Sequence, residues 1–315
     1  MIMRLLSLTL WAGLLAGTGS LTNAAAPSAP FTIEENGQGF STLSAAVAAI
    51  GAGDGTILIR AGVYRECAVQ TAGRVAYRAA VPGSVVFDGV ACEGKAGLVL
   101  RGRAAHIEGI VFRGFRVADR NGAGIRVERG DVSIVQSQFR NSEQGVLTAD
   151  DPQATLSIDR STFAGLGGCP NGQCSHSVYT GNLGRVIVRQ SRFEAGTGGH
   201  YVKARAARIE ITDTSFDDSR GNATNYAIDL PAGASGIIAR NEFLIGPNKE
   251  NHSAIIAVGA EQASHGSAGL SVSANRARLA PGISWPTSFV ANWTRDRISL
   301  SGNDLGPGIQ PYATR

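Results

Sequence analysis

One motif recurs along most of the chain and limits its fold more than any other feature. Two apolar residues flank one variable position, and two mostly polar positions, a small polar residue, a variable residue and an apolar anchor follow. Successive anchors are 27, 24, 30, 23, 27, 34 and 28 residues apart. The anchors are Phe112, Phe139, Phe163, Phe193, Phe216, Phe243, Ala277 and Leu305. Repeats of this length bury their apolar faces only by stacking on their neighbours.

Apolar residues at every second position predict strands with one buried face. Most repeats are shorter than the roughly 30 residues of a strand–helix–strand unit, and they contain no helical pattern. We therefore expect an all-β solenoid in which each repeat forms one coil and coils lie about 4.8 Å apart. The phenylalanine anchors should stack inside, and the small polar residues should stack at a corner. These polar residues are Ser137, Ser161, Ser191, Thr214, Asn241 and Asn275.

The open end of a solenoid needs a cap. The segment Ser41–Ile50 has an amphipathic pattern that predicts a short N-terminal capping helix with Ser41 as its N-cap. No linker interrupts the chain after this segment. We therefore expect a single domain that covers residues 26–315.

Residues 1–25 have the features of a signal peptide. Arg4 precedes an apolar run, Leu5–Gly17, that is too short to span a bilayer, and small residues follow at Asn23–Ala26. No other apolar run reaches about 18 residues, so we expect no membrane span in the mature form. The protein should be exported, either to the periplasm or into the medium.

The net charge and the composition limit which classes of binding partner this protein can have. Hydrophobic residues make up 43% of the chain, which excludes a disordered protein. The net charge is only +4, so we expect no nucleic-acid partner, and an acidic substrate is compatible with this balance. We expect a monomer.

Four cysteines fit an exported protein with two disulfides. Cys169 and Cys174 are close enough in the sequence to close a small loop, which leaves Cys67 to pair with Cys92. A zinc site is the alternative, but no second close pair of Cys or His accompanies them.

The start of the mature chain resembles a known group of proteins. The stretches Gly39–Val47 and Gly55–Glu66 are similar to the opening of right-handed parallel β-helix proteins such as pectate lyases, alginate lyases, uronan epimerases and polygalacturonases. The resemblance implies a right-handed parallel β-helix over nearly the whole mature chain. It implies polysaccharide chemistry less strongly, because this fold hosts several activities.

Rare residue types gather in three successive repeats. The chain has only three lysines, and one of them lies here. The segments are His176–Gly181, His200–Arg205 and Tyr226–Pro231. If Val178, Val202 and Ile228 align as core residues, the residue after each of them faces outward.

This alignment predicts two columns of side chains about 4.8 Å apart within each column. The outward column contains Tyr179, Lys203 and Asp229. Alternation places Tyr201 and Arg205 beside Lys203 on the same face. A second column at the strand entry contains His176, His200 and Tyr226. In the next coil Asn251, His252 and Glu261 would extend the groove.

These residue types suit β-elimination on a uronic acid. The reaction needs a cation to neutralise the sugar carboxylate, a base to take the C5 proton and an acid for the leaving oxygen. Arg205 can pair with the carboxylate, Lys203 or His200 can be the base, and Tyr179 or Tyr226 can be the acid. We expect an acidic polysaccharide substrate, which further side chains would bind. These are His176, Tyr201, Tyr226, Asp229, Arg208 and Asn251.

Other interpretations remain open. A C5 epimerase needs the same groups, with the proton returned from the opposite face. Stacked polar residues on a solenoid also occur as ordinary cross-strand pairs, and the inward parity of His176 and His200 fits core histidines. The tyrosines at 179, 201 and 226 could form the aromatic strip of a carbohydrate-binding solenoid without catalysis.

Hydrolysis is a further alternative. The resemblance to polygalacturonases would require a group of aspartates, a Gly-His pair and an Arg-Ile-Lys string. The chain has Asp150-Asp151 and Gly199-His200, but their spacing is too long and no Arg-Ile-Lys string follows. No metal-binding motif is present in the sequence; Ca²⁺ bound by ligands from separate coils would not form one.

Overall fold

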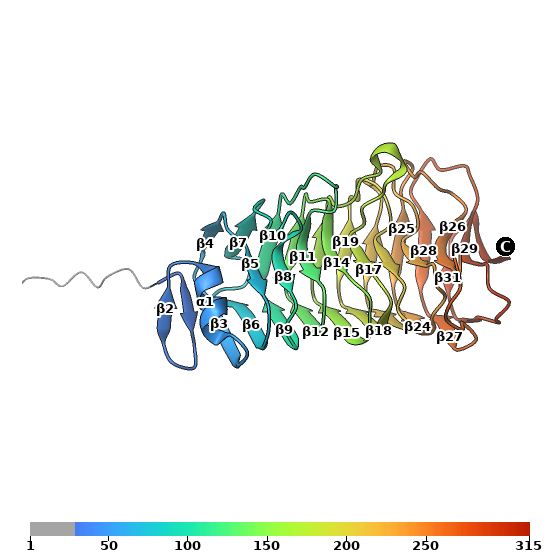
Figure 1. Cartoon of the computed structure of the whole chain (residues 1–315). Helices are drawn as coiled ribbons and strands as arrows, with labels where there is room; N and C mark the ends of the chain where they lie inside the picture. Colours follow the sequence, from blue (N-terminus) through green and yellow to red (C-terminus); the bar gives the residue numbers. More distant parts are fainter. Residues whose placement is uncertain (1–28) are drawn as a thin grey trace, which may run out of the picture.

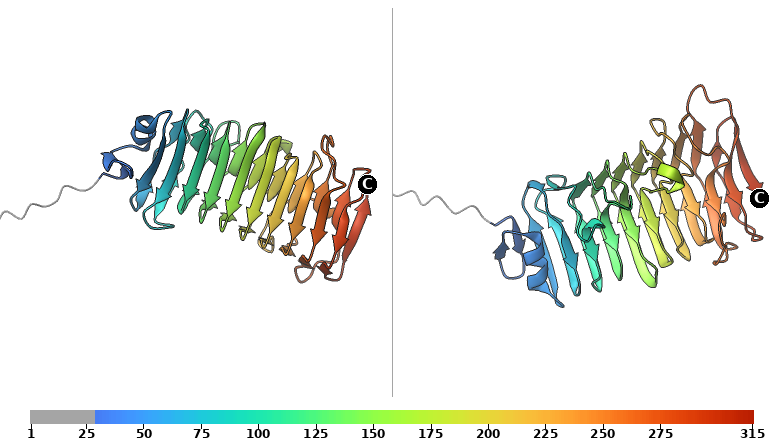
Figure 2. Two further views of the ribbon diagram at one scale, coloured as in Figure 1. Left: turned by 90° about the horizontal axis from the view of Figure 1, so that it is seen from below. Right: turned by 45° about the horizontal axis from the view of Figure 1, so that its top comes forward.

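A computed structural model describes residues 29–315. The predicted signal peptide, residues 1–25, lies outside the described residues. The chain winds into a parallel β-helix of about nine turns, and each turn contributes one strand to each of three sheets (Figure 1). The two further views show the strands of successive turns lying side by side along the whole length (Figure 2). The predicted all-β solenoid is confirmed.

Sheet A has 12 strands and sheets B and C have 10 each. All pairs are parallel except those of β1 with β2 and β3. The strands of sheet A, in spatial order, are β2 (Gln38–Phe40), β1 (Phe31–Ile33), β3 (Asp54–Ile59), β6 (Arg74–Ala79), β9 (Ala104–Glu108), β12 (Asp131–Val135), β15 (Asp151–Asp159), β18 (Leu183–Arg189), β21 (Arg208–Thr212), β24 (Ser235–Ala239), β27 (Leu270–Ser273) and β30 (Ser299–Ser301).

Sheets B and C follow the same order of coils. The strands of sheet B are β4 (Gly62–Tyr64), β7 (Val85–Asp88), β10 (Ile110–Arg113), β13 (Gln138–Arg140), β16 (Thr162–Ala164), β19 (Arg192–Glu194), β22 (Ser215–Asp217), β25 (Glu242–Ile245), β28 (Arg276–Leu279) and β31 (Asp304–Leu305). The strands of sheet C are β5 (Ala68–Gln70), β8 (Ala96–Leu100), β11 (Ala123–Val127), β14 (Gln144–Thr148), β17 (Val178–Thr180), β20 (Val202–Ala204), β23 (Ile228–Leu230), β26 (Ala254–Val258), β29 (Thr287–Asn292) and β32 (Ile309–Thr314).

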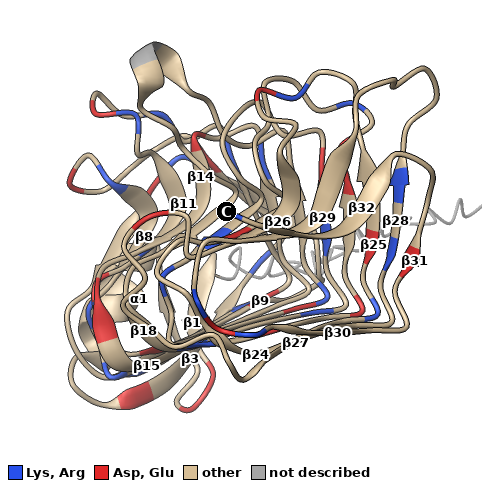
Figure 3. Ribbon diagram, turned by 90° about the vertical axis from the view of Figure 1, so that its right-hand side faces the viewer, with Lys and Arg blue, Asp and Glu red and all other residues tan. Residues whose placement is uncertain are grey.

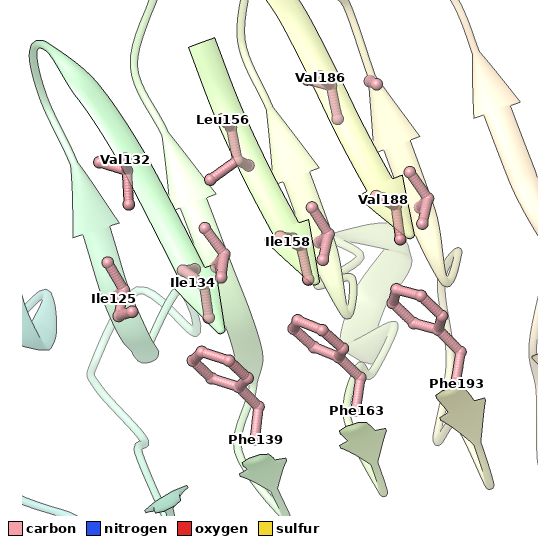
Figure 4. Packing of buried hydrophobic residues seen from close by; sticks show 14 of the residues in the cluster. Ile125, Val132, Ile134, Phe139, Leu156, Ile158, Phe163, Val186, Val188 and Phe193 are labelled. Atoms are coloured by element: carbon pink, nitrogen blue, oxygen red, sulfur yellow. The ribbon is translucent and has the colours of Figure 1, made fainter. Parts of the chain in front are cut away.

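The interior of the solenoid is a continuous apolar core. The phenylalanine anchors stack nearly face to face from one coil to the next, and the ring centroids of Phe139, Phe163 and Phe193 are 4.7 Å apart at each step. Figure 4 shows these three rings below the aliphatic residues of sheet A. The identical register of Phe139, Phe163 and Phe193 in sheet B produces the stack.

A polar ladder follows the corner between sheets A and B. Each small polar side chain accepts a hydrogen bond from the main-chain N–H of its counterpart one coil earlier; for example, Thr214 donates to Asn241 Oδ1 at 3.0 Å. The ladder runs through Ser137, Ser161, Ser191, Thr214, Asn241, Asn275 and Asn303. It satisfies buried main-chain donors at the turn, where the sheets supply no partner.

The N-terminal end is covered by helix α1 (Leu43–Ile50) and the β1–β2 hairpin. Leu43, Ala46 and Val47 of the helix are buried against the first coil. The N-cap is Thr42, which accepts a hydrogen bond from the Ala45 N–H at 3.2 Å, rather than the expected Ser41. The helix therefore begins one residue later than the pattern indicated.

Both predicted disulfides are confirmed, Cys67–Cys92 and Cys169–Cys174. The second closes the loop that carries the short helix η1 (Pro170–Gly172) and projects from the solenoid between β16 and β17. Figure 3, seen along the axis, shows basic and acidic residues interspersed on the outside of the coils. Within residues 29–315, no helix has the length and apolar character needed to cross a membrane.

Loss of one side chain of the polar ladder should destabilise the protein. Asn241→Ala removes the acceptor of the Thr214 N–H and two hydrogen bonds of the buried amide, to Ile211 O and Asn275 Oδ1. We expect a loss of about 2–4 kcal/mol in the free energy of unfolding, because buried partners are left unsatisfied. Urea denaturation measures it. Asn248→Ala, at an exposed position, is the control; equal stability of the two variants would contradict a stabilising ladder.

Candidate functional site

The outer face of sheet C carries the outward column that the sequence predicted. Tyr179 of β17 pairs in register with Lys203 of β20, and Lys203 pairs with Asp229 of β23. The residues that precede them, Val178, Val202 and Ile228, are fully buried in the core. Three side chains that are about 25 residues apart in the sequence therefore lie on adjacent strands.

Lys203 and Arg205 together hold one carboxylate. The Lys203 Nζ donates to Glu261 Oε1 at 2.6 Å, and an Arg205 Nη atom donates to Glu261 Oε2. Arg205 also donates through Nη1 to the Tyr179 phenol oxygen at 2.5 Å. Burial alone would raise the pKa of Glu261, but Lys203 and Arg205 outweigh it and lower that pKa. We call Lys203 and Arg205 the carboxylate clamp.

Glu261 reaches the clamp from the loop between β26 and β27. This loop crosses back over the preceding coil, where the N–H groups of Ser264 and His265 donate to Ala232 O, both at 2.8 Å. The His265 imidazole lies 3.2 Å from Arg205 O and 3.1 Å from Asn182 Oδ1. The sequence indicated only that Glu261 could extend the groove; its place in the clamp depends on this loop path.

Asp229 lies behind Lys203 and is only 3% exposed. Its Oδ2 is 3.5 Å from Lys203 Nζ and 3.4 Å from His200 Nε2. Within the described residues, its Oδ1 has no hydrogen-bond partner. Burial raises the pKa of Asp229 to about 6, although Lys203 opposes the shift. This deeply buried carboxyl therefore contacts Lys203 and His200 and not the molecular surface.

The second column forms an imidazole ladder. The rings of His176 and His200 stack at 4.8 Å, and His200 stacks on Tyr226 at 5.3 Å. His176 Nδ1 accepts the His200 N–H at 3.0 Å, and His200 Nδ1 accepts the Tyr226 N–H at 3.1 Å. Each neutral ring therefore carries its proton on Nε2.

This geometry argues against His200 as the base. Burial lowers its pKa well below the usual value, and the positive charges of Lys203 and Lys249 add to the shift. The ring stays neutral, but its only unprotonated nitrogen is occupied by a main-chain N–H. His200 is instead a donor toward Asp229, and both histidines are buried as the core alternative expected.

Tyr201 does not lie beside Lys203. It is 2% exposed and packs between Phe193 and Phe216 in the core. Its hydroxyl donates to Asp218 Oδ1 at 2.7 Å and accepts the Gly196 N–H. Strand β20 begins only at Val202, so strict alternation does not extend back to residue 201. The expected outward position of Tyr201 was wrong for this reason.

The remaining predicted substrate-binding residues are placed differently. Arg208 lies in β21 of sheet A, on another face, and the structure does not bring it to the clamp. Asn251 bonds Asn225 at the C-terminal side of the column, where the Tyr226 hydroxyl is 3.3 Å from Ser253 Oγ. Tyr226 and Asn251 therefore border the site, whereas Arg208 does not.

The residues of the hydrolase alternative are dispersed. Asp150 Oδ1 accepts the Asn182 N–H at 2.7 Å, and Asp151 Oδ2 accepts the Gly130 N–H at 3.0 Å at the start of β15. Both carboxylates cap turns, away from His200. Among the described residues, one group could hold a metal, Cys169, Cys174 and Glu250, but its two thiols are joined in a disulfide.

A groove of about 400 Å³ extends from Tyr179 and Arg205 along sheet C toward the N-terminus. It is lined by Leu147, Thr148 and Arg126 on the strand side. A larger hollow of about 490 Å³ lies on the outer face of sheet A around Ala76, His106 and Ser133, away from the clamp. The groove on sheet C is therefore the one that meets the column.

Comparison with known proteins supports the fold. No protein-family model matches the chain, and no curated protein matches it. Among solved structures, an alginate lyase from Paenibacillus sp. str. FPU-7 is similar with a TM-score of 0.65 and 16% identity, over 86% of this chain and 95% of the other. A pectin methylesterase variant in complex with a hexasaccharide matches with a TM-score of 0.38 and 12% identity, over 88% and 78%.

The imidazole ladder should make the protein acid-sensitive. Burial, with help from Lys203 and Arg205, lowers the pKa of His176 to about 3. Between pH 6.5 and 3 the unfolded chain binds a proton that the folded chain does not, so stability falls as the pH falls. His176→Asn keeps an acceptor for the His200 N–H without titrating. We expect the variant to lose about 2 kcal/mol less than the wild type between pH 7 and pH 5.

Urea denaturation at several pH values provides the comparison. Asp229 has a raised pKa and shifts stability in the opposite direction, but it does so in both proteins and cancels in the difference. Parallel pH profiles for the wild type and His176→Asn would contradict a buried neutral imidazole at this position.

Proposed function

We propose that this protein is an exported lyase that cleaves an acidic, uronate-containing polysaccharide by β-elimination. The observation that carries the proposal is the carboxylate clamp. Lys203 and Arg205 already hold a carboxylate, that of Glu261, and Arg205 also touches the Tyr179 oxygen. A uronate carboxylate in place of Glu261 would bring its C5 atom toward the phenol. The similarity in fold to an alginate lyase, which acts on such a polymer, agrees with the proposal.

The contacts around the clamp support one set of roles. Arg205 neutralises the uronate carboxylate, which makes the C5 proton more acidic. The guanidinium also stabilises negative charge on the Tyr179 oxygen, so Tyr179 takes the C5 proton. The carboxylate of Asp229, which stays beside Lys203 when Glu261 leaves, stabilises positive charge on Lys203, and Lys203 donates a proton to the leaving oxygen. The sequence suggested the reverse roles for Tyr179 and Lys203; the placement of the charges favours this order.

The resting structure implies that Glu261 must leave the clamp before a substrate enters. Glu261 is about half exposed, whereas Lys203 beneath it is nearly buried. The loop that carries Glu261 is attached to the solenoid mainly through main-chain bonds to Pro231 and Ala232, so its side chain can swing away without breaking the fold. A second anion can then take its place between the two cations.

A C5 epimerase remains the nearest alternative, since it uses the same clamp and the same base. Hydrolysis is a second candidate because two carboxylates, Asp229 and Glu261, flank Lys203. Burial raises the pKa of Asp229 and the cations lower that of Glu261, a difference that suits an acid and a nucleophile. The burial of Asp229 argues against direct contact with a glycosidic oxygen. The two disulfides fit an oxidising, extracytoplasmic compartment for any of these activities.

The lyase proposal predicts an unsaturated product. The purified mature protein should raise ultraviolet absorbance with one member of a panel that includes alginate, pectate and glycosaminoglycans, with and without calcium. Tyr179→Phe and Lys203→Ala should each lower kcat by at least a hundredfold, because each removes one proton-transfer group. Arg113→Ala, on the outer face of sheet B, is the folded control.

Each alternative has its own signature in the same panel. Exchange of the C5 proton with solvent without ultraviolet absorbance would replace the lyase by an epimerase. Release of reducing ends without absorbance, abolished in Asp229→Asn, would replace it by a hydrolase. Full activity in Tyr179→Phe or Lys203→Ala would overturn the assigned roles.

Displacement of Glu261 is testable separately. Glu261→Gln keeps the side-chain size but removes the charge that competes with the substrate. We expect KM for the polymer to fall severalfold while kcat stays within twofold. Glu242→Gln, exposed on β25, is the matched control. A collapse of kcat in Glu261→Gln would show that this carboxylate takes part in the chemistry.

A further inference from the structure

The outward column of sheet C continues beyond Tyr179 toward the N-terminus. Tyr179 pairs in register with Leu147 of β14, and Leu147 pairs with Arg126 of β11. Because coils lie about 4.8 Å apart, Arg126 is roughly 10 Å from Tyr179 along the axis. Both residues line the same groove, with Leu147 between them.

Arg126 has donor capacity that the fold leaves unused. Its Nε is buried and has no hydrogen-bond partner within the described residues. The carboxylate paired with it is that of Glu128, whose Oε1 is 3.9 Å from Nε, beyond hydrogen-bond distance. Glu128 is already bonded to Lys95 at 2.7 Å and Arg101 at 2.5 Å. A buried donor in this state is stabilised by an acceptor from outside the protein.

The charge around Arg126 is positive as well. Three cations, Lys95, Arg101 and Arg126, meet two carboxylates, Glu93 and Glu128, in one network. The network therefore carries one more positive charge than negative charges. An anionic group in the groove would both balance the charge of this network and accept a hydrogen bond from Arg126 Nε.

The middle of the groove has a different character. Leu147 borders the groove there but is only 8% exposed, because it packs against Val99, Ala123 and Tyr179. Of the described residues that line the groove, the cationic ones are Arg126 at one end and Arg205 at the other, and the exposed carboxylate of Asp150 lies along it. A sugar over Leu147 thus meets no cation among the described residues that line the groove.

We infer that Arg126 binds the carboxylate of a second uronate, two sugar positions from the residue held by the carboxylate clamp. This inference rests on the proposed function, because it takes the ligand to be the same acidic polysaccharide. In an extended chain one sugar spans about one coil, so two coils separate alternate residues. The groove provides a cation for the carboxylate at each of the two end positions. It provides no cation for a carboxylate at the position between them. It therefore accepts both homopolymers of uronate and polymers in which uronate alternates with a neutral sugar.

The test compares Arg126→Ala, Arg126→Lys and the control Arg113→Ala, which removes a solvent-exposed arginine of sheet B. KM and kcat are measured on oligosaccharides of increasing length made from the polymer that the lyase degrades. We expect Arg126→Ala to raise KM about tenfold for oligosaccharides that span both ends, with kcat unchanged. The shortest cleaved oligosaccharides should not distinguish it from the wild type. Arg126→Lys should recover part of the loss.

Two kinetic results would overturn the inference. One is an unchanged KM for long oligosaccharides in Arg126→Ala. The other is a loss of kcat at every length, which would indicate an effect at the reacting centre or on the fold. If the loss of kcat comes from an effect on the fold, the thermal unfolding midpoint of Arg126→Ala should be lower than that of Arg113→Ala.

A binding assay distinguishes the failure of this inference from the failure of the proposed function. Retardation in native gels that contain alginate, pectate or hyaluronate is measured for the full mature chain and each variant, with no catalysis required. Weaker retardation of Arg126→Ala by an acidic polymer supports the site even if no polymer is cleaved, and the lyase proposal alone then fails. Equal retardation of Arg126→Ala and Arg113→Ala by every polymer that retards the wild type overturns the site, as does the absence of retardation for the wild type.

Discussion

Main-chain hydrogen bonding between successive coils is the interaction on which the rest of this molecule depends. Each parallel strand pairs with the equivalent strand of the next coil, so every side chain is repeated at the strand spacing. The phenylalanine stack and the polar ladder both follow from this register. Neither would hold if a coil slipped by one residue, because the whole inward set would then face solvent. The rigid register is what allows short strands of three residues to place side chains reproducibly.

The candidate site uses the same register for a different purpose. Tyr179, Lys203 and Asp229 belong to three separate coils, yet they form one column because their strands are paired. The imidazole ladder beside it fixes the orientation of His176 and His200 through main-chain donors. Chemical groups of different kinds are thus held on a scaffold that does not need to move. The part that must move is the side chain of Glu261, which comes from a loop outside the repeat.

Local patterns in the sequence were reliable wherever the repeat is regular. The alignment of Val178, Val202 and Ile228 was sufficient to place Lys203 between Tyr179 and Asp229. The same rule failed at Tyr201, one residue before β20, where the chain is still in a turn and the phenol enters the core to meet Asp218. The helical pattern likewise missed the helix N-cap by one residue, which is Thr42 and not Ser41. Both differences lie at the ends of elements, where the periodic pattern no longer determines the direction of a side chain.

The sequence by itself determined the solenoid, the ladders and the outward column, because each depends on spacing that repeats from coil to coil. It also determined both disulfides, because Cys169 and Cys174 are close enough in the sequence to close a small loop and leave one further pair. Only the tertiary structure decided that Glu261 occupies the clamp, that Asp229 is buried behind Lys203 and that Arg126 shares a groove with Tyr179. The physical reason is that loop paths and burial depend on what packs over a strand. A repeat encodes the strand itself, whereas the segments that cover it have no period of their own.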